Sequence, residues 1–179
     1  ERQVGEICAA QGAFYTLAAP ATGTAASEVL QVLGIGEISR TLTLSLVPAP
    51  LIPDLRRELR DRLLMTQPGQ GILFTVPLSG INARSARWIS RGMEGKPVER
   101  SELPMEQANF ELILALTNRG CSDEVMAAAR LAGATGGTLL HARMLGSQEA
   151  EHFLGIQLQK EKELVAILAR GEYKVPIMQ

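Results

Sequence analysis

The chain has 179 residues, enough for one ordinary domain or two small ones, and its composition, 46% hydrophobic but only 4% aromatic, suits α/β packing. The 18 basic and 19 acidic residues leave a net charge of -1, which favours neither nucleic acid nor an anionic membrane as a partner. The apolar runs are shorter than the roughly 20 residues of a membrane-spanning helix, and two distant cysteines, Cys8 and Cys121, indicate a reducing cytoplasmic environment.

The first part of the chain predicts two strands with a helix between them. Residues 1–11 are expected to be a polar lead-in, Phe14–Ala19 a strand, and residues 27–33 a short helix. In residues 40–47 leucines alternate with hydroxyl residues, which is the clearest strand pattern in the chain. We expect its leucine face to meet helices and its hydroxyl face to meet water, another sheet or a subunit interface.

A second helix and a third strand are predicted next. Leucines recur every fourth residue from Leu51 to Leu63, with a charged face that we expect to be solvated. A turn with Gly69 and Gly71 then leads to residues 72–77, which are predicted to form a buried strand. Residues 81–107 are predicted to be a linker, because most of them are polar and interrupted by Pro and Gly without periodicity.

The rest of the chain repeats the first part. Phe110 corresponds to Phe14, and Glu124-Val125 to Glu28-Val29, with the same sequence offset in both cases. The predicted strand 40–47 then corresponds to residues 163–169. We therefore predict an α+β protein with two tandem ferredoxin-like (βαββαβ) units and antiparallel sheets. The units span residues 12–80 and 108–179, the second lacking its C-terminal helix and strand. Exposed sheet faces of such units favour oligomerisation.

A glycine-rich turn, Thr135-Gly136-Gly137-Thr138, joins the predicted helix and strand of the second part. Its amides suit an anionic ligand, although glycine also commonly ends a helix, so both interpretations stay open. Valine at position 137 is expected to block a ligand while leaving the fold largely intact. The loop from Gly146 to Gly155 is expected to become ordered when a ligand or partner binds.

The ordered set of a helix ending at this turn, a strand ending in Gly146-Ser147-Gln148 and the strand Glu161-Lys162-Glu163-Leu164-Val165 resembles the PII nitrogen-regulatory signalling family, in particular its short-loop PII-like members. The resemblance implies a non-enzymatic regulator that binds a small metabolite or nucleotide, such as ATP, ADP or 2-oxoglutarate, between units and controls a partner protein. It implies a homo-oligomer, a trimer or a dimer of tandem chains, while the charge balance and the short apolar runs predict no nucleic-acid partner and no membrane insertion. The implied ligand contacts are Gly69, Gly71, Arg84, Arg87, Gly136, Gly137, Thr138 and Gln148.

The sequence departs from that family at Ile72, where nucleotide-binding members carry a lysine, and this weakens the case for a phosphate site. Two alternatives stay open. One is a CutA-like trimeric metal-binding protein that uses His141 or His152, although an isolated histidine is usually structural. The other is a small hydrolase on the same fold, with Asn118-Arg119 as its anion-binding loop.

Overall fold

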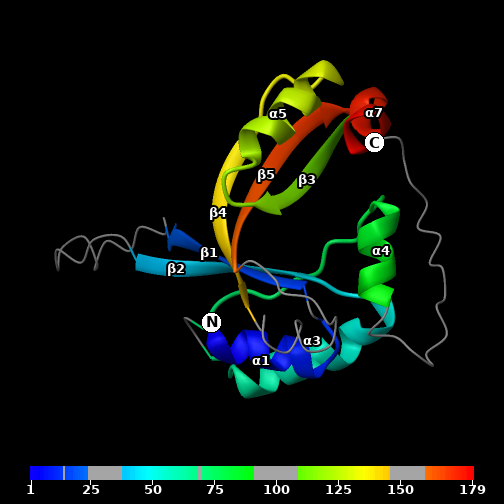
Figure 1. Ribbon diagram of the computed structural model, residues 1–179. Helices are drawn as coiled ribbons and strands as arrows, with labels where there is room; N and C mark the ends of the chain where they lie inside the picture. The colour runs from blue at the N-terminus through cyan, green and yellow to red at the C-terminus, as the bar shows by residue number, and fades with distance from the viewer. Residues whose placement is uncertain (14, 24–37, 68–69, 91–108, 146–159) are drawn as a thin grey trace.

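The computed structural model describes residues 1–13, 15–23, 38–67, 70–90, 109–145 and 160–179. These residues form an α+β fold around one five-stranded antiparallel sheet, in the order β2-β1-β4-β5-β3 (Figure 1). The predicted helix 27–33, most of the linker and the loop 146–155 lie outside the described residues. Among the described residues, no helix has the length and apolar character needed to cross a lipid bilayer.

Strands β1 (Tyr15–Gly23) and β2 (Ile38–Leu46) pair along their whole length, close to the ranges predicted for them. Helices α1 (Arg2–Ala10) and α3 (Ile52–Arg62) pack together below this pair (Figure 1). Their shared core consists of Ile7, Cys8, Ala13, Leu55 and Leu59.

The prediction of a polar lead-in at residues 1–11 is wrong, because those residues form α1. Val4, Ile7 and Cys8 recur at helical spacing and give α1 an apolar face, which packs against α3. That spacing was the available signal, and the polar residues around it obscured it.

The prediction for the hydroxyl face of β2 is also wrong in part. Thr16 of β1 is buried, and its Oγ1 atom lies 2.8 Å from Ser45 Oγ, which lies 3.6 Å from Cys8 Sγ of α1. Thr41 Oγ1 donates to a carboxylate oxygen of Glu1 at 2.8 Å. The hydroxyl face therefore meets α1 at Ser45, whereas Thr41 is exposed beside Glu1, so the prediction is wrong only for the part near Ser45. Small hydroxyl groups can be buried there because they satisfy one another's hydrogen bonds.

In the second half of the chain, β5 (Glu161–Arg170) lies between β3 (Phe110–Asn118) and β4 (Thr138–Leu145), which confirms the predicted strands. Helix α5 (Ser122–Leu131) covers one face of these strands, and the short helix α7 (Lys174–Met178) follows a 3-10 turn at Gly171–Tyr173. The core beneath α5 consists of Ile113, Ala129, Ala134, Val165, Ile167 and Ala169.

The two halves join through a short contact between β1 and β4, in which Thr16–Ala18 pair with Arg143–Leu145. Strand β1 therefore has a neighbour on each side. The prediction of a buried strand at residues 72–77 is wrong: these residues form no strand, and Ile72 is 88% exposed and Phe74 72% exposed. The chain then forms α4 (Ala83–Ser90) within the predicted linker.

Candidate functional site

The turn between α5 and β4 is the best described part of the predicted ligand site. It begins at Gly133, whose φ of 105° favours glycine, and whose N–H donates to Arg130 O at 3.1 Å. A Cβ atom on Gly133 would lie 2.5 Å from Cδ1 of the Tyr173 ring. Gly133 therefore ends α5 and makes room for Tyr173, which are structural roles.

The next two glycines of the turn have different surroundings. A Cβ atom on Gly137 would lie 2.9 Å from Met126 Sδ and 3.2 Å from Ala166 O, so Gly137 permits the close packing of α5 over β5. A Cβ atom on Gly136 would have no atom within 4 Å, and Thr138, the first residue of β4, is exposed. Ligand access is therefore open at Gly136. We expect valine at 137 to disturb the fold, contrary to the sequence prediction.

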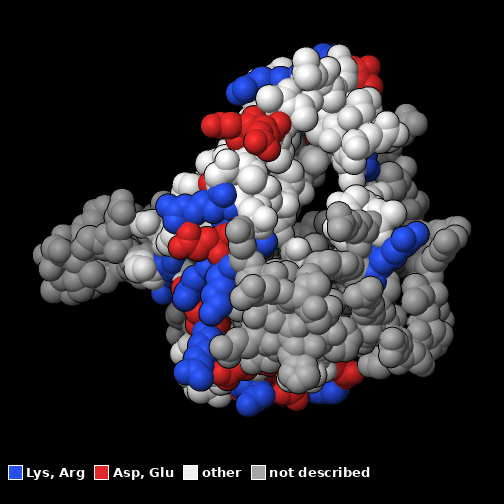
Figure 2. Space-filling model, in the orientation of Figure 1, with Lys and Arg blue, Asp and Glu red and all other residues white. Residues whose placement is uncertain are grey.

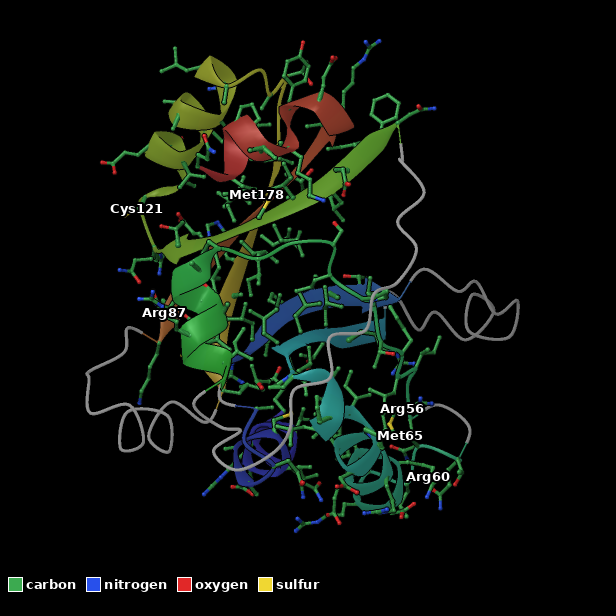
Figure 3. All side chains as sticks on the ribbon, turned by 90° about the vertical axis from the view of Figure 1, so that its right-hand side faces the viewer. Arg56, Arg60, Met65, Arg87, Cys121 and Met178 are labelled. Carbon is green, nitrogen blue, oxygen red and sulfur yellow. The ribbon has the colours of Figure 1, made fainter. Side chains whose placement is uncertain are left out.

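The other predicted contacts are not gathered around this turn within one chain. Gly71, with a φ of 126°, follows α3, and Arg87 is exposed on α4. Figures 1 and 3 both place α4 apart from the turn that precedes β4. Arg84 belongs to α4, but its side chain lies outside the described residues, as do Gly69 and Gln148.

A polar cluster that the sequence analysis missed lies where α5 begins. The buried carboxylate of Glu163 accepts hydrogen bonds from the backbone of Gly120 and, at 3.2 Å, from the N–H of Ser122. These bonds, with that from Gly120 the strongest, hold the pKa of Glu163 below its usual range. Glu163 therefore occupies the amino-terminal end of α5, where an anion is favoured by the helix dipole. Its partners lie about 40 residues away in the sequence, which is why no local pattern revealed it.

This cluster bears on the hydrolase alternative. Asn118 Oδ1 accepts a hydrogen bond from Lys162 Nζ at 2.6 Å, and Arg119 pairs with Glu161. Burial lowers the pKa of Lys162. The groups of the suggested anion-binding loop are thus engaged by the chain's own side chains.

The metal-binding alternative rests on His141 and His152. His141 is exposed, and its Nδ1 atom lies 3.8 Å from a carboxylate oxygen of Glu163, while His152 lies outside the described residues. Within the described ranges, no group of three or more His, Cys, Asp or Glu residues could hold a metal ion.

A second group missed by the sequence analysis fixes the loop before α4 onto β3. Lys174 Nζ donates to Ser79 Oγ at 2.7 Å and to Glu111 Oε1 at 3.0 Å, and Ser79 Oγ donates to Glu111 Oε2 at 3.2 Å. The hydrogen bond from Lys174 lowers the pKa of Glu111. Figure 3 shows α7, with Met178, lying against β3. Three segments distant in the sequence are thus held together at one end of the sheet.

The predicted charged face of α3 is solvated, as expected. Arg57 pairs with Asp54 and Arg60 with Asp61, and all four side chains are largely exposed. Figure 2 shows charged side chains gathered along the lower rim of the molecule, over α1 and α3. Exposed pairs of this kind contribute little to stability, because solvent screens them.

Comparisons of the chain with protein-family models, with curated proteins and with solved structures gave no match. The described residues define an α+β protein with a five-stranded antiparallel sheet. The turn from Gly136 to Thr138 is its candidate site, since a side chain on Gly136 would meet open space and Thr138 is exposed.

Proposed function

We propose that the chain is a non-enzymatic regulator resembling PII proteins and acting, as that resemblance implies, in nitrogen regulation. In this proposal a small anionic metabolite or nucleotide binds at the Gly136–Thr138 turn and changes the affinity of the chain for a partner protein. The ligand exerts control because it binds one state of the following loop, from Gly146 to Gly155, more tightly than another. The protein acts in the cytoplasm as a homo-oligomer, a trimer or a dimer of tandem chains.

The observation that carries the proposal is the matching register of two strand pairs. When residues 40–47 and 163–169 are aligned from their first residues, Tyr15 and Leu46 have Glu111 and Ala169 as their counterparts. Tyr15 lies opposite Leu46 in the β1–β2 pair, and Glu111 lies opposite Ala169 in the β3–β5 pair. Two unrelated strand pairs have no reason to share a register, so the match supports two tandem units of one pattern.

The order of the strands gives further support. Along the chain, β3 is followed by α5, β4 and β5, while across the sheet the order is β4-β5-β3. This is the arrangement of the first four elements of a ferredoxin-like unit, with β5 between the other two strands. The second half of the chain therefore fits the βαββ part of the unit that the PII resemblance implies.

The choice of ligand follows from the chemistry of the turn. Successive backbone amides attract anions, and Gly136 leaves room for close approach. ATP, ADP and 2-oxoglutarate all carry suitable groups. The nucleotides rank only slightly ahead of other small anions, because the exposed Ile72 stands where nucleotide-binding relatives of the PII type carry a lysine.

Isothermal calorimetry with ATP, ADP and 2-oxoglutarate tests the proposal on the wild type and on Gly136→Val. The valine has open space, so the fold should persist, while its side chain blocks approach to the amides. We expect wild type to bind at least one of the three and Gly136→Val to bind it at least tenfold more weakly, about 1.4 kcal/mol.

Gly80→Val is the matched control, because a Cβ atom there would make only ordinary contacts, at 3.7 Å or more, with α7. It should bind like the wild type, and all three proteins should have similar melting temperatures. Equal binding by Gly136→Val would remove the turn as the site. If wild type binds none of the three ligands, a regulator that acts through protein contacts alone becomes the better account.

A further inference from the structure

The outer edge of β3 is an apolar strand edge. Among the residues that the structure describes, β3 is the last strand of the sheet and pairs only with β5. Phe110, Leu112 and Leu114 are exposed along it, beside the exposed Leu168 of β5. Strand edges with these properties readily accept another strand, and natural proteins usually block them with charges, bulges or a covering element.

The same chain carries an unpaired apolar segment, Ile72–Leu78. None of its residues is charged, and Ile72, Phe74, Val76 and Leu78 are all exposed. Within the described residues, no backbone group of this segment bonds to another backbone group. Leu73 is exposed as well, at 38%, so the whole segment is uncovered, and the apolar residues at alternate positions from Ile72 to Leu78 are typical of a strand.

The hydrogen-bonding direction of β3 follows from one bond at its start. Gly171 N donates to Asn109 O at 3.1 Å, so the backbone groups of Asn109 point toward β5. In an antiparallel ladder this direction alternates from residue to residue. Leu112, Leu114 and Leu116 therefore direct their N–H and C=O groups to the free edge.

In a strand added to that edge, alternate residues direct their N–H groups toward β3, and Pro77 fits only at a position that points away. Proline has no N–H, so it is tolerated in an edge strand where its nitrogen points away from the partner. Val76 and Leu78 then bond to β3. Their side chains, like those of Ile72 and Phe74, come to lie on the same sheet face as Leu112 and Leu114. This pairing satisfies the backbone and brings apolar side chains together.

We propose that Ile72–Leu78 of a second copy of this chain adds antiparallel to β3 as a sixth strand, and that the exchange is reciprocal. Each copy supplies one strand and accepts one, so two copies form a closed, symmetric assembly. The proposal does not depend on the ligand or the partner of the proposed function.

Ser79 of the same chain bonds to Glu111 at the start of β3, so docking of the chain's own segment is the competing arrangement, and burial favours a second copy over it. Docking within one chain would add four apolar side chains to a sheet face where Leu112, 63% exposed, and Leu168, 62% exposed, are already uncovered. A second copy carries a folded body with its strand, and that body can cover the enlarged apolar face. Contiguous exposed apolar patches are characteristic of interaction sites.

Two proline variants test the donor strand. Val76→Pro removes an N–H that faces β3 in the proposed pairing, whereas Thr75→Pro removes one that faces away, and neither residue lies in a helix or strand of the single chain. We expect light scattering to give the mass of two or more chains for wild type and Thr75→Pro at micromolar concentration. Val76→Pro should raise the dissociation constant at least tenfold. A single-chain mass for wild type, or equal effects of the two prolines, would overturn the proposal.

Lysine on the acceptor edge provides the second test, because an edge lysine opposes strand addition. Leu114→Lys should dissociate the assembly, while Leu42→Lys, at an exposed position on the opposite edge strand β2, should not. A mixture of Val76→Pro and Leu114→Lys chains retains one intact donor and one intact acceptor. We expect the mixture to recover two-chain species that neither variant forms alone, and failure to do so would count against strand exchange.

Discussion

The β1–β2 and β3–β5 ladders share one register but present opposite faces to their covering helices. Thr16 and Ser45 are paired across the first ladder and lie against α1. At the corresponding places of the second ladder, Leu112 and Leu168 are paired and exposed. In the β1–β2 ladder these positions are polar and covered by a helix, whereas in the β3–β5 ladder the corresponding positions are apolar and uncovered.

Strand direction explains this reversal. Each neighbouring pair in the order β1-β4-β5-β3 is antiparallel, so β1 and β3 run in opposite directions within one sheet. The second ladder is therefore turned over relative to the first. Helices α1 and α5 cover the same face of the whole sheet, which is not the same face of the two ladders. Local sequence alone does not determine which side of a strand is buried.

The largest expected effect comes from adjacent residues on the two faces of β5. Ile167 is 1% exposed beneath α5, so Ile167→Ala should reduce the free energy of unfolding by about 2–5 kcal/mol. With both variants measured in the Val76→Pro background, which should not form the two-chain assembly, Leu168→Ala, on the face that is uncovered in the single chain, should cost less than about 0.5 kcal/mol. Denaturant unfolding measures both. Comparable losses would mean that Leu168 is also covered in solution.

The sequence was sufficient to predict the strands β1 to β5 and helices α3 and α5, because their apolar periodicity is strong. It failed at residues 72–77, which have the pattern of a strand but form none. The two places beside β1, where a further strand of the first unit could pair, are taken by β2 and β4. The sequence predicted β2 itself but not what covers the hydroxyl face of β2, since the partial burial of Ser45 depends on α1, which is distant in the sequence. The periodicity of the sequence therefore predicted the helices and strands, while strand pairing and the burial of each strand face depended on tertiary contacts.

The candidate site shows the same limit. Gly136 and Gly137 are indistinguishable as neighbouring glycines, yet one has open space and the other lies against Met126. The importance of Glu163 was invisible for a similar reason, because its partners Gly120 and Ser122 come from another element. Sequence alone predicted a turn there, but the role of each residue required the packing around it.

A smaller effect is expected where the two ladders correspond. Thr16 Oγ1 bonds with Ser45 Oγ and, at 3.3 Å, with Ala13 O, so Thr16→Val removes buried hydrogen bonds and should cost about 0.5–1.5 kcal/mol. Leu112→Val, the corresponding substitution on the uncovered face of the second ladder, should leave thermal unfolding nearly unchanged in the Val76→Pro background, where no second copy covers that face. If Leu112→Val were the more damaging of the two, the polar and covered character of the first ladder would not be its stabilising feature.

The smallest effect, confined to acid, concerns Glu163, whose carboxylate links β5 to the start of α5. Its pKa is lower in the folded chain than the unfolded value of about 4.3, so its ionised form favours folding. That contribution is complete above the unfolded pKa and is lost as the pH falls through the lower folded pKa. Glu163→Gln should therefore flatten the dependence of unfolding free energy on pH below about 4.3, while Glu161→Gln, at an exposed residue, should retain it. Denaturant unfolding between pH 3 and 7 distinguishes these outcomes, and an unchanged slope in Glu163→Gln would show that other carboxylates control the acid response.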